Sequence, residues 1–246
     1  MKKNNIEIKS KTKDLTILIP TLNEEFTIER LINEIIKKMK NTKIKYCIMI
    51  TDNNSKDKTI EIASKKKDVL INICKKPGYG ANLISGIKRI RSKYTIFFDA
   101  DGSYNPSYIK ILYNEIIKSN CDLVTYNRLK KQQKNSMPFL NKYLGTPILS
   151  FLIRNIYGIN VYDNNAGMRI SKTSTLQKLN LKCSGMEFAS EMLIKISLKK
   201  LKYKELTLKF RKDYRNKAPH LKKWSDGYRH LRYILLNMYK SNRFSN

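Results

Sequence analysis

The chain has 246 residues, of which 41% are hydrophobic and 10% aromatic, with 50 Lys and Arg against 20 Asp and Glu. This apolar content is enough for one large domain with a buried core and excludes an intrinsically disordered chain. The formal net charge of +30 indicates a negatively charged partner: a nucleic acid, an anionic membrane surface or a phosphate-bearing substrate. Scattered lysines of this kind also occur on faces that are merely solvated.

The remaining composition bounds the cellular setting. Four cysteines lie far apart without metal-ligand spacing, so we expect free thiols in a reducing compartment. Residues 1–14 are polar and basic and lack the apolar segment of a signal peptide. No apolar run reaches the roughly 20 residues that span a bilayer. We therefore expect a soluble or peripheral chain with a tail over 1–14, a main domain over 15–220 and a basic amphipathic helix over 221–246.

Strand-like and helix-like patterns alternate along the first half of the chain. Leu15 to Ile19 is predicted to be a buried strand stopped by Pro20, and Asn23 is expected to cap a helix from about Glu24 to Lys38. Further strands are predicted over residues 46–50, 69–74, 94–98 and 122–126, with helices over about 58–65, 81–91 and 106–118. This order predicts an α/β fold with a mostly parallel sheet and helices on both faces.

The second half is less regular. Residues 140–157 are rich in large apolar side chains and are broken by Gly145 and Pro147, which favours core or groove wall over a membrane interface. Residues 166–170 and 204–210 have strand patterns, and residues 186–199 have a helical pattern. From about Leu221, aromatic and leucine residues recur at helical spacing beside arginines. That pattern is typical of an interfacial amphipathic helix or of a core-packed terminal helix with a basic face.

Polar clusters follow four of the predicted strands, at residues 20–24, 52–55, 75–80 and 99–103. Ligands of parallel α/β sheets bind at the carboxyl ends of the strands, so these clusters are expected to meet. Asp99 and Asp101 lie two residues apart after a buried strand and can hold a hard cation such as Mg²⁺ or Mn²⁺. One such pair alone more often forms a turn. Carboxylates in three clusters and glycines in the fourth indicate a nucleotide and metal site.

The motifs of these clusters occur in the order seen in a known family: Ile19-Pro20-Thr21-Leu22-Asn23-Glu24, Asp52-Asn53-Asn54-Ser55, Gly78-Tyr79-Gly80, Asp99-Ala100-Asp101-Gly102 and Gly167-Met168-Arg169. The chain resembles the family 2 glycosyltransferases over about residues 15–235. Two later runs resemble the branch of dolichyl- and polyprenyl-phosphate mannose or glucose synthases. They are residues 185–193 and the pair of segments 219–221 and 226–231.

This resemblance implies a GT-A fold, a nucleotide-sugar donor and a divalent metal, Mg²⁺ or Mn²⁺. It implies metal contacts at Asp99 and Asp101, with Ser103 nearby. Phosphate contacts are implied at Arg128 and at Arg211, with Arg215 or Lys217 as competitors for the position of Arg211. The residues implied at the nucleoside, ribose and diphosphate are Pro20, Leu22, Glu24, Ile50, Asp52, Phe98, Asp99, Ala100 and Asp101.

The chain also departs from the family pattern. Asn53-Asn54 stands where many members have Asp-Gly, and we expect Asn53 to alter contacts to the base without abolishing binding. His220 stands where many synthases have lysine, which leaves the contact to the acceptor phosphate open. Many relatives continue into membrane spans after the region that corresponds to Leu235.

The expected reaction is an inverting displacement on GDP-mannose or UDP-glucose, with Asp101, Asp163 and Arg128 as the candidate catalytic residues. A lipid phosphate acceptor is already ionised, so positioning and electrostatics suffice for the transfer and no general base is needed. A hydroxyl acceptor on a glycan, glycolipid or protein needs a base, for which Asp163 is the candidate by family position unless it only forms a turn. Glu187 and Glu191 fall on one helix face, and we favour them as partners of lysines over site-wall residues.

The expected location is the cytoplasmic side of an anionic membrane, where a phosphorylated polyprenol would lie. A nucleic-acid-binding protein is a distant alternative suggested by charge alone, because no recognition module is evident. A catalytically silent transferase fold is opposed by the intact Asp99 and Asp101.

Overall fold

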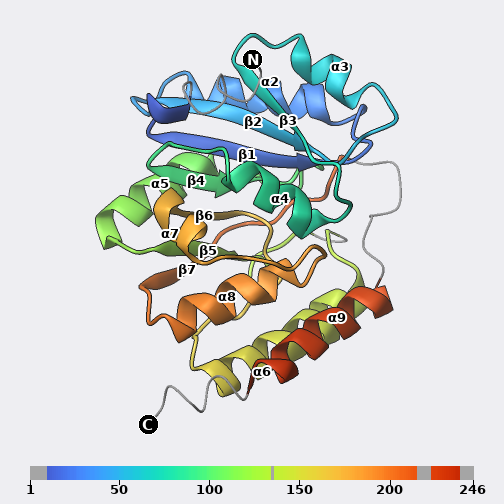
Figure 1. Cartoon of the computed structure of the whole chain (residues 1–246), viewed down its shortest axis with the longest axis vertical. Coiled ribbons are helices and arrows are strands. Elements are labelled where there is room, and N and C mark those ends of the chain that lie inside the picture. Colours follow the sequence, from blue (N-terminus) through green and yellow to red (C-terminus); the bar gives the residue numbers. More distant parts are fainter. Residues whose placement is uncertain (1–9, 134–135, 215–222, 239–246) are drawn as a thin grey trace.

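A computed structural model describes residues 10–133, 136–214 and 223–238 (Figure 1). Its seven-stranded sheet has the order β3-β2-β1-β4-β6-β5-β7. Among these strands β6 alone runs antiparallel to its neighbours β4 and β5. The strands are β1 (Leu15–Thr21), β2 (Tyr46–Asp52), β3 (Val69–Ile73), β4 (Tyr94–Phe97), β5 (Leu123–Asn127), β6 (Arg169–Lys172) and β7 (Tyr203–Thr207). The predicted mostly parallel sheet is confirmed.

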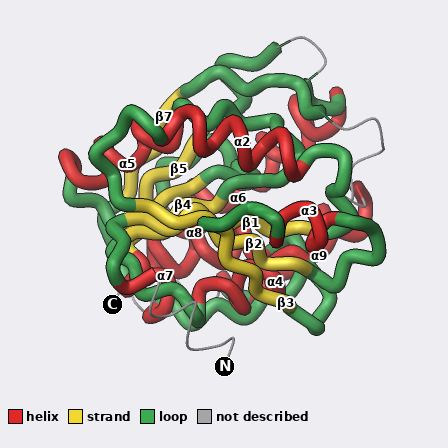
Figure 2. Tube along the Cα trace, turned by 90° about the horizontal axis from the view of Figure 1, so that it is seen from above, coloured by secondary structure: helices red, strands yellow, loops and turns green. Residues whose placement is uncertain are grey.

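Helices cover both faces of the sheet, as Figure 2 shows from above. One face carries α2 (Ile28–Met39), α3 (Thr59–Ser64) and α5 (Tyr108–Ser119), and the other carries α4 (Tyr79–Ile87), α7 (Thr173–Lys178) and α8 (Phe188–Leu198). Beyond α8 lie the π-helical turn η1 (Asn141–Gly145), α6 (Thr146–Tyr157) and α9 (Lys223–Leu236), with α6 and α9 side by side (Figure 1). The fold is the expected α/β architecture with a C-terminal amphipathic helix.

The central strand β1 shows how the sequence builds two core layers. All seven of its residues are buried. Successive side chains of a strand point to opposite faces, so Ile17 and Ile19 pack under α2 while Leu18 packs under α4. A strand buried on both faces has a continuous apolar run instead of an alternating one.

Two local predictions were wrong. The helix after β1 begins at Ile28 and not at Glu24, because Asn23 adopts a φ of 54° and its Oδ1 accepts the Lys56 amide at 2.9 Å instead of capping. Pro20 does not stop the strand but lies within it, paired with Thr51 of β2. The short helix α7 was not predicted.

The two ends of the described chain pack on the domain. Ser10 is buried and its Oγ accepts the Arg91 amide at 2.9 Å. At the other end, α9 contacts α6 and α8, and the Tyr157 hydroxyl donates to the Ile234 carbonyl at 2.5 Å. No helix in the described ranges is long and apolar enough to cross a membrane. All four cysteines are free thiols, as expected.

Candidate functional site

Four parallel strands and the start of β6 bring the candidate residues to one edge of the sheet. Strands β1, β2, β4 and β5 end there, and β6 begins there because it runs antiparallel, with Arg169 opposite Phe97. The loop after β4 (residues 98–103), the residue after β5 (Arg128) and the loop before β6 (residues 163–167) therefore lie at the same edge.

Asp52, at the end of β2, is fully buried and already has three hydrogen-bond donors. Its Oδ1 accepts the Ser55 amide at 2.7 Å, and its Oδ2 accepts the Thr21 and Ser55 hydroxyls at 2.7 and 2.6 Å. The carboxylate thus joins β1 to the turn after β2. Its expected contact with a base stays a prediction.

The other residues expected at the nucleoside differ in how accessible they are. Pro20 is buried within β1, and Ile50, Phe98 and Ala100 belong to the core, so only their main chains can reach a ligand. Leu22 is half-buried. Glu24 is buried, and its Oε2 accepts the Thr27 hydroxyl at 3.0 Å.

Asn53, the departure from the family pattern, holds the loop between β3 and α4. Its Nδ2 donates to the carbonyls of Cys74 and Lys76 at 3.0 and 2.7 Å, and its Oδ1 accepts the Gly78 amide at 2.8 Å. An aspartate cannot supply the two donated bonds. The asparagine therefore has a structural role in this loop, and the altered base contact that we expected stays a prediction.

Asp99 lies between Tyr79 and Gly167. The Tyr79 hydroxyl, at the start of α4, donates to Asp99 Oδ1 at 3.0 Å. A Cβ at Gly167 would lie 2.0 Å from Asp99 Oδ2, so only glycine lets the carboxylate lie against this main chain. The Gly167 amide in turn donates to the Tyr104 hydroxyl at 2.7 Å. The loop before β6 thus fixes the position of Asp99.

Asp101 is held by its own turn. Its Oδ1 accepts the Ser103 amide and hydroxyl at 2.9 and 2.6 Å, so Ser103, which was expected near the metal, orients the carboxylate. Gly102 between them has a φ of 76°, a conformation that glycine adopts without strain. The Tyr214 ring lies where a side chain at Gly102 would project.

A segment after β7, residues 210–214, binds across this turn, and we call it the strap. The Tyr214 amide donates to the Asp101 carbonyl at 2.8 Å, and Arg211 Nε donates to the Gly102 carbonyl at 2.6 Å. Arg211 also pairs with Glu34 of α2 at 3.0 Å, and the Tyr214 hydroxyl donates to the same carboxylate at 2.8 Å. The structure thus places Arg211 in a contact with α2, and its expected phosphate contact stays a prediction.

Arg128 and Asp163 form a bidentate ion pair at the end of β5. Arg128 Nε and Nη2 donate to Asp163 Oδ2 and Oδ1 at 2.7 and 2.9 Å, and the Arg128 amide donates to Oδ2 at 2.9 Å. Burial lowers the pKa of Arg128, but the charge and hydrogen bonds of Asp163, together with the nearby Tyr104 and Asp99, raise that pKa above its ordinary value. The Arg128 side chain is 13% exposed and that of Asp163 0%. A ligand can therefore reach the arginine but not the carboxylate.

Glu205 of β7 supports this pair from behind. Its Oε1 accepts the amides of Tyr162 and Asp163 at 2.9 and 3.0 Å, and its Oε2 accepts Asn127 Nδ2 at 2.9 Å. Burial raises the pKa of Glu205 above its ordinary value. Sequence reasoning missed Glu205, Tyr79 and Tyr214, of which only Tyr79 carried a signal, its place between two glycines.

A divalent cation fits the donor set of this edge. The described residues contain no group of three or more Asp, Glu, His or Cys side chains that could hold a metal. Mg²⁺ commonly takes one or two carboxylates and completes its shell with water and substrate phosphates. Asp99 and Asp101 supply two hard oxygen ligands of that kind on one loop.

The remaining candidates have clear placements. Glu191 pairs with Lys195 at 2.7 Å and accepts the amides of Lys182 and Cys183, which confirms it as a lysine partner. Glu187 Oε1 accepts the Gly185 amide at 3.2 Å. Arg215, Lys217 and His220 lie outside the described residues, so the predictions for them stay predictions.

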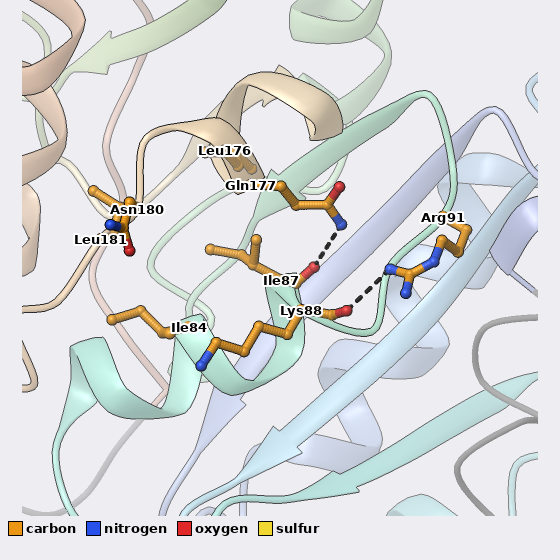
Figure 3. Close-up of a pocket in the computed structure, with 8 residues that line it drawn as sticks. All are labelled: Ile84, Ile87, Lys88, Arg91, Leu176, Gln177, Asn180 and Leu181. Carbon is orange, nitrogen blue, oxygen red and sulfur yellow. Dashed lines mark hydrogen bonds between the residues drawn. The ribbon is translucent and has the colours of Figure 1, made fainter.

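A surface hollow of about 320 Å³ lies elsewhere, between α4 and α7 (Figure 3). Gln177 crosses it and donates to the carbonyls of Ile87 and Ile90 at 3.1 and 3.0 Å. This hollow is at the C-terminal end of α4, whereas Tyr79 and Asp99 meet at the N-terminal end. It is therefore separate from the candidate site.

The fold defines a class, that of the GT-A glycosyltransferases. Solved structures share the fold: glucosyl-3-phosphoglycerate synthase from Mycobacterium tuberculosis, in complex with Mn²⁺, UDP-glucose and phosphoglyceric acid, superposes with a TM-score of 0.71 at 16% identity. That match covers 97% of this chain and 84% of the synthase.

The chain belongs to glycosyl transferase family 2, whose family profile matches residues 16–179. It is 31% identical over 224 residues to the low-salt glycan biosynthesis hexosyltransferase Agl6 of Haloferax volcanii, covering 91% of this chain and 53% of that protein. It is 29% identical over 221 residues to the UDP-N-acetylglucosamine–dolichyl-phosphate N-acetylglucosaminyltransferase of Methanococcus voltae, covering 80% and 85%.

Proposed function

We propose that this glycosyltransferase moves a hexose, with inversion, from a nucleotide sugar to the phosphate of a polyprenol or dolichol, with Mg²⁺ or Mn²⁺ as cofactor. GDP-mannose and UDP-glucose are the expected donors, and the name of the Methanococcus relative adds UDP-N-acetylglucosamine. Its dolichyl-phosphate acceptor supports the proposed acceptor class.

The choice of acceptor rests on one observation, the burial of Asp163 and its ion pair with Arg128. A hydroxyl acceptor needs a base within hydrogen-bond reach of its proton. Asp163 is fully buried, and both its oxygens accept from Arg128. In this conformation neither oxygen of the carboxylate is presented to an acceptor proton. A phosphate acceptor is ionised at neutral pH and needs no base, so it suits a site whose candidate base is an ion-pair partner.

Each residue of the site then has a role that its geometry supports. Arg128 donates from Nε and Nη2 to Asp163. We propose that its Nη1 group binds a substrate phosphate, for which guanidinium geometry is well suited. Asp163 positions Arg128, as Tyr79 and Gly167 position Asp99. When bound at Asp99 and Asp101, the metal would neutralise charge on the departing nucleotide diphosphate.

The helices α6 and α9, with the turn η1, offer a surface that could contact the lipid. Large apolar side chains are exposed just before and within η1, on α6 and on α9: Phe139, Leu140, Tyr143, Leu144, Ile148, Phe151, Tyr228, Leu231, Leu235 and Leu236. Arg229 and Arg232 lie exposed on α9 among them. Apolar and basic side chains together suit the interface of an anionic membrane. We propose that this face binds the membrane that holds the acceptor, as a peripheral contact.

Transfer of labelled sugar to a short polyprenyl phosphate, with the unphosphorylated polyprenol as the matched acceptor, tests this proposal. We expect product with the phosphate only, and loss of product in Arg128→Lys, which keeps the charge but loses the fork that pairs with Asp163. Product with the alcohol and none with the phosphate would overturn the proposed acceptor.

A further inference from the structure

The loop before β6 is held from two helices at once. The Asn164 amide donates to Ser150 Oγ of α6 at 2.9 Å, and Asn165 Nδ2 donates to Thr146 Oγ1 of the same helix at 3.3 Å. From the other side, Asn164 Nδ2 donates to Ser190 Oγ of α8 at 3.0 Å. This short loop carries Asp163, the partner of Arg128, and Gly167, which lies against Asp99.

Ser190 extends this contact to α9. Its Oγ lies 2.7 Å from Nδ1 of His230, and both side chains are buried, with exposed fractions of 0% and 3%. Ser190 Oγ also lies 3.2 Å from Asn164 Oδ1. When the neutral imidazole carries its proton on Nε2, Asn164 Nδ2 donates to Ser190 Oγ and the Ser190 hydroxyl donates to His230 Nδ1, so each proton is used once. Burial, together with the charge of Arg169, lowers the pKa of His230 to about 4, so the ring is neutral at physiological pH.

Ser190 and His230 are remote from the reacting groups, because only Asn164 joins them to the loop. The loop is nevertheless the shared support of two site residues. Asn164 lies between Asp163 and Gly167 in this loop, next to the residues that contact Arg128 and Asp99. A buried polar chain fixes one arrangement only when every member is satisfied, and each of these three is bonded to the next.

We propose that His230 and Ser190 are positioning residues, which through Asn164 hold residues 163–167 in the conformation that presents Arg128 and Asp99 to a metal-bound nucleotide. His230 lies on α9, the helix with the exposed apolar face, so the seating of that helix sets the geometry of the site. The inference rests on the proposed function for its ligands.

Ser190→Ala tests this chain of hydrogen bonds from Asn164 through Ser190 to His230, which we call the relay. Ser197→Ala is the matched control. Ser197 lies on the same helix and also donates to a buried partner, the Tyr157 carbonyl, but has no link to the loop. Binding of Mn²⁺ with UDP, and separately with GDP, is measured by calorimetry. We expect Ser190→Ala to weaken binding about 10-fold, the order of magnitude for the loss of one buried hydrogen bond, and Ser197→Ala to leave binding unchanged. His230→Asn keeps a polar group near the place of Nδ1, and we expect it to retain more affinity than His230→Leu.

A second readout does not depend on the donor. The amides of Asp163, Asn165 and Gly167 are hydrogen-bonded in the structure, so their hydrogen exchange reports the loop directly. We expect faster exchange in Ser190→Ala and not in Ser197→Ala. Equal exchange in the two variants, or full nucleotide affinity in Ser190→Ala, would overturn the inference. If the unaltered protein binds neither nucleotide, the proposed function fails, and exchange still decides on the relay.

Discussion

Replacing Gly167 by alanine perturbs the site at one defined contact. The new Cβ would lie 2.0 Å from Asp99 Oδ2 and 2.7 Å from its Cγ, about 1.4 Å short of the 3.4 Å at which ordinary van der Waals contact begins. The φ of Gly167 lies outside the left-handed range, so the backbone itself tolerates alanine. The Asp99 carboxylate must therefore leave its present position, and its hydrogen bond with the Tyr79 hydroxyl is disturbed.

A misplacement of about 1 Å in a catalytic group can cost on the order of 100-fold in rate. We expect Gly167→Ala to lower kcat/KM by about that factor, and to weaken Mn²⁺ binding in the presence of UDP or GDP. Mn²⁺ affinity is followed by electron paramagnetic resonance of the free ion, and thermal unfolding is recorded in parallel to show that the fold persists.

Gly227→Ala is the control for this variant. Gly227 lies within α9 with no other group within 4 Å of an added Cβ, so alanine should stabilise the helix by about 0.5–1 kcal/mol and leave Mn²⁺ affinity unchanged. Normal turnover and normal metal affinity in Gly167→Ala would refute the placement of Asp99 in the metal site.

The remaining predictions address the buried groups and the exposed face. Asp163→Asn leaves a buried arginine without its counter-ion, and we expect a loss of about 3–5 kcal/mol in the free energy of unfolding, measured by urea titration. His230 has a pKa of about 4 in the folded protein against its ordinary value of 6.5. Its contribution to the free energy of unfolding is therefore complete above pH 6.5 and falls by about 3 kcal/mol as the pH drops towards 4. His230→Asn should flatten the plot of unfolding free energy against pH over this range. Glu34→Gln weakens the anchor of the strap, and we expect faster amide exchange at Tyr214 and weaker Mn²⁺ binding. Phe151→Ser should reduce sedimentation with anionic vesicles and leave nucleotide binding intact.

The layout of the site could be predicted from sequence because it follows from topology. A strand-then-helix order gives a parallel sheet, and a parallel sheet gathers its carboxyl ends, so Asp52 and Asp99 were expected at one edge and lie there. Arg128, which was expected only from the family resemblance, follows β5 at the same edge. Glu191 was likewise expected to pair with a lysine, and it pairs with Lys195, four residues along the helix.

The partners of these residues were beyond prediction because they depend on contacts between distant segments. Asp163 and Arg128 are 35 residues apart, and the contact of Arg211 with Glu34 joins residues 177 apart. Asn23 shows the same limit locally: its side chain favours a helix cap, but a hydrogen bond to a neighbouring loop takes precedence. Sequence spacing identifies which side chains reach an edge, while tertiary packing decides what each one binds.

Release of nucleotide from GDP-mannose, UDP-glucose and UDP-N-acetylglucosamine tests the central claim most directly. Each donor is assayed with and without Mn²⁺ and with and without a short polyprenyl phosphate, and Asp101→Ala serves as the blank. We predict release with one donor that requires the metal, the lipid phosphate and Asp101 together. Release that proceeds equally without the lipid phosphate, or that survives in Asp101→Ala, would contradict the proposed transfer to a lipid phosphate at this site.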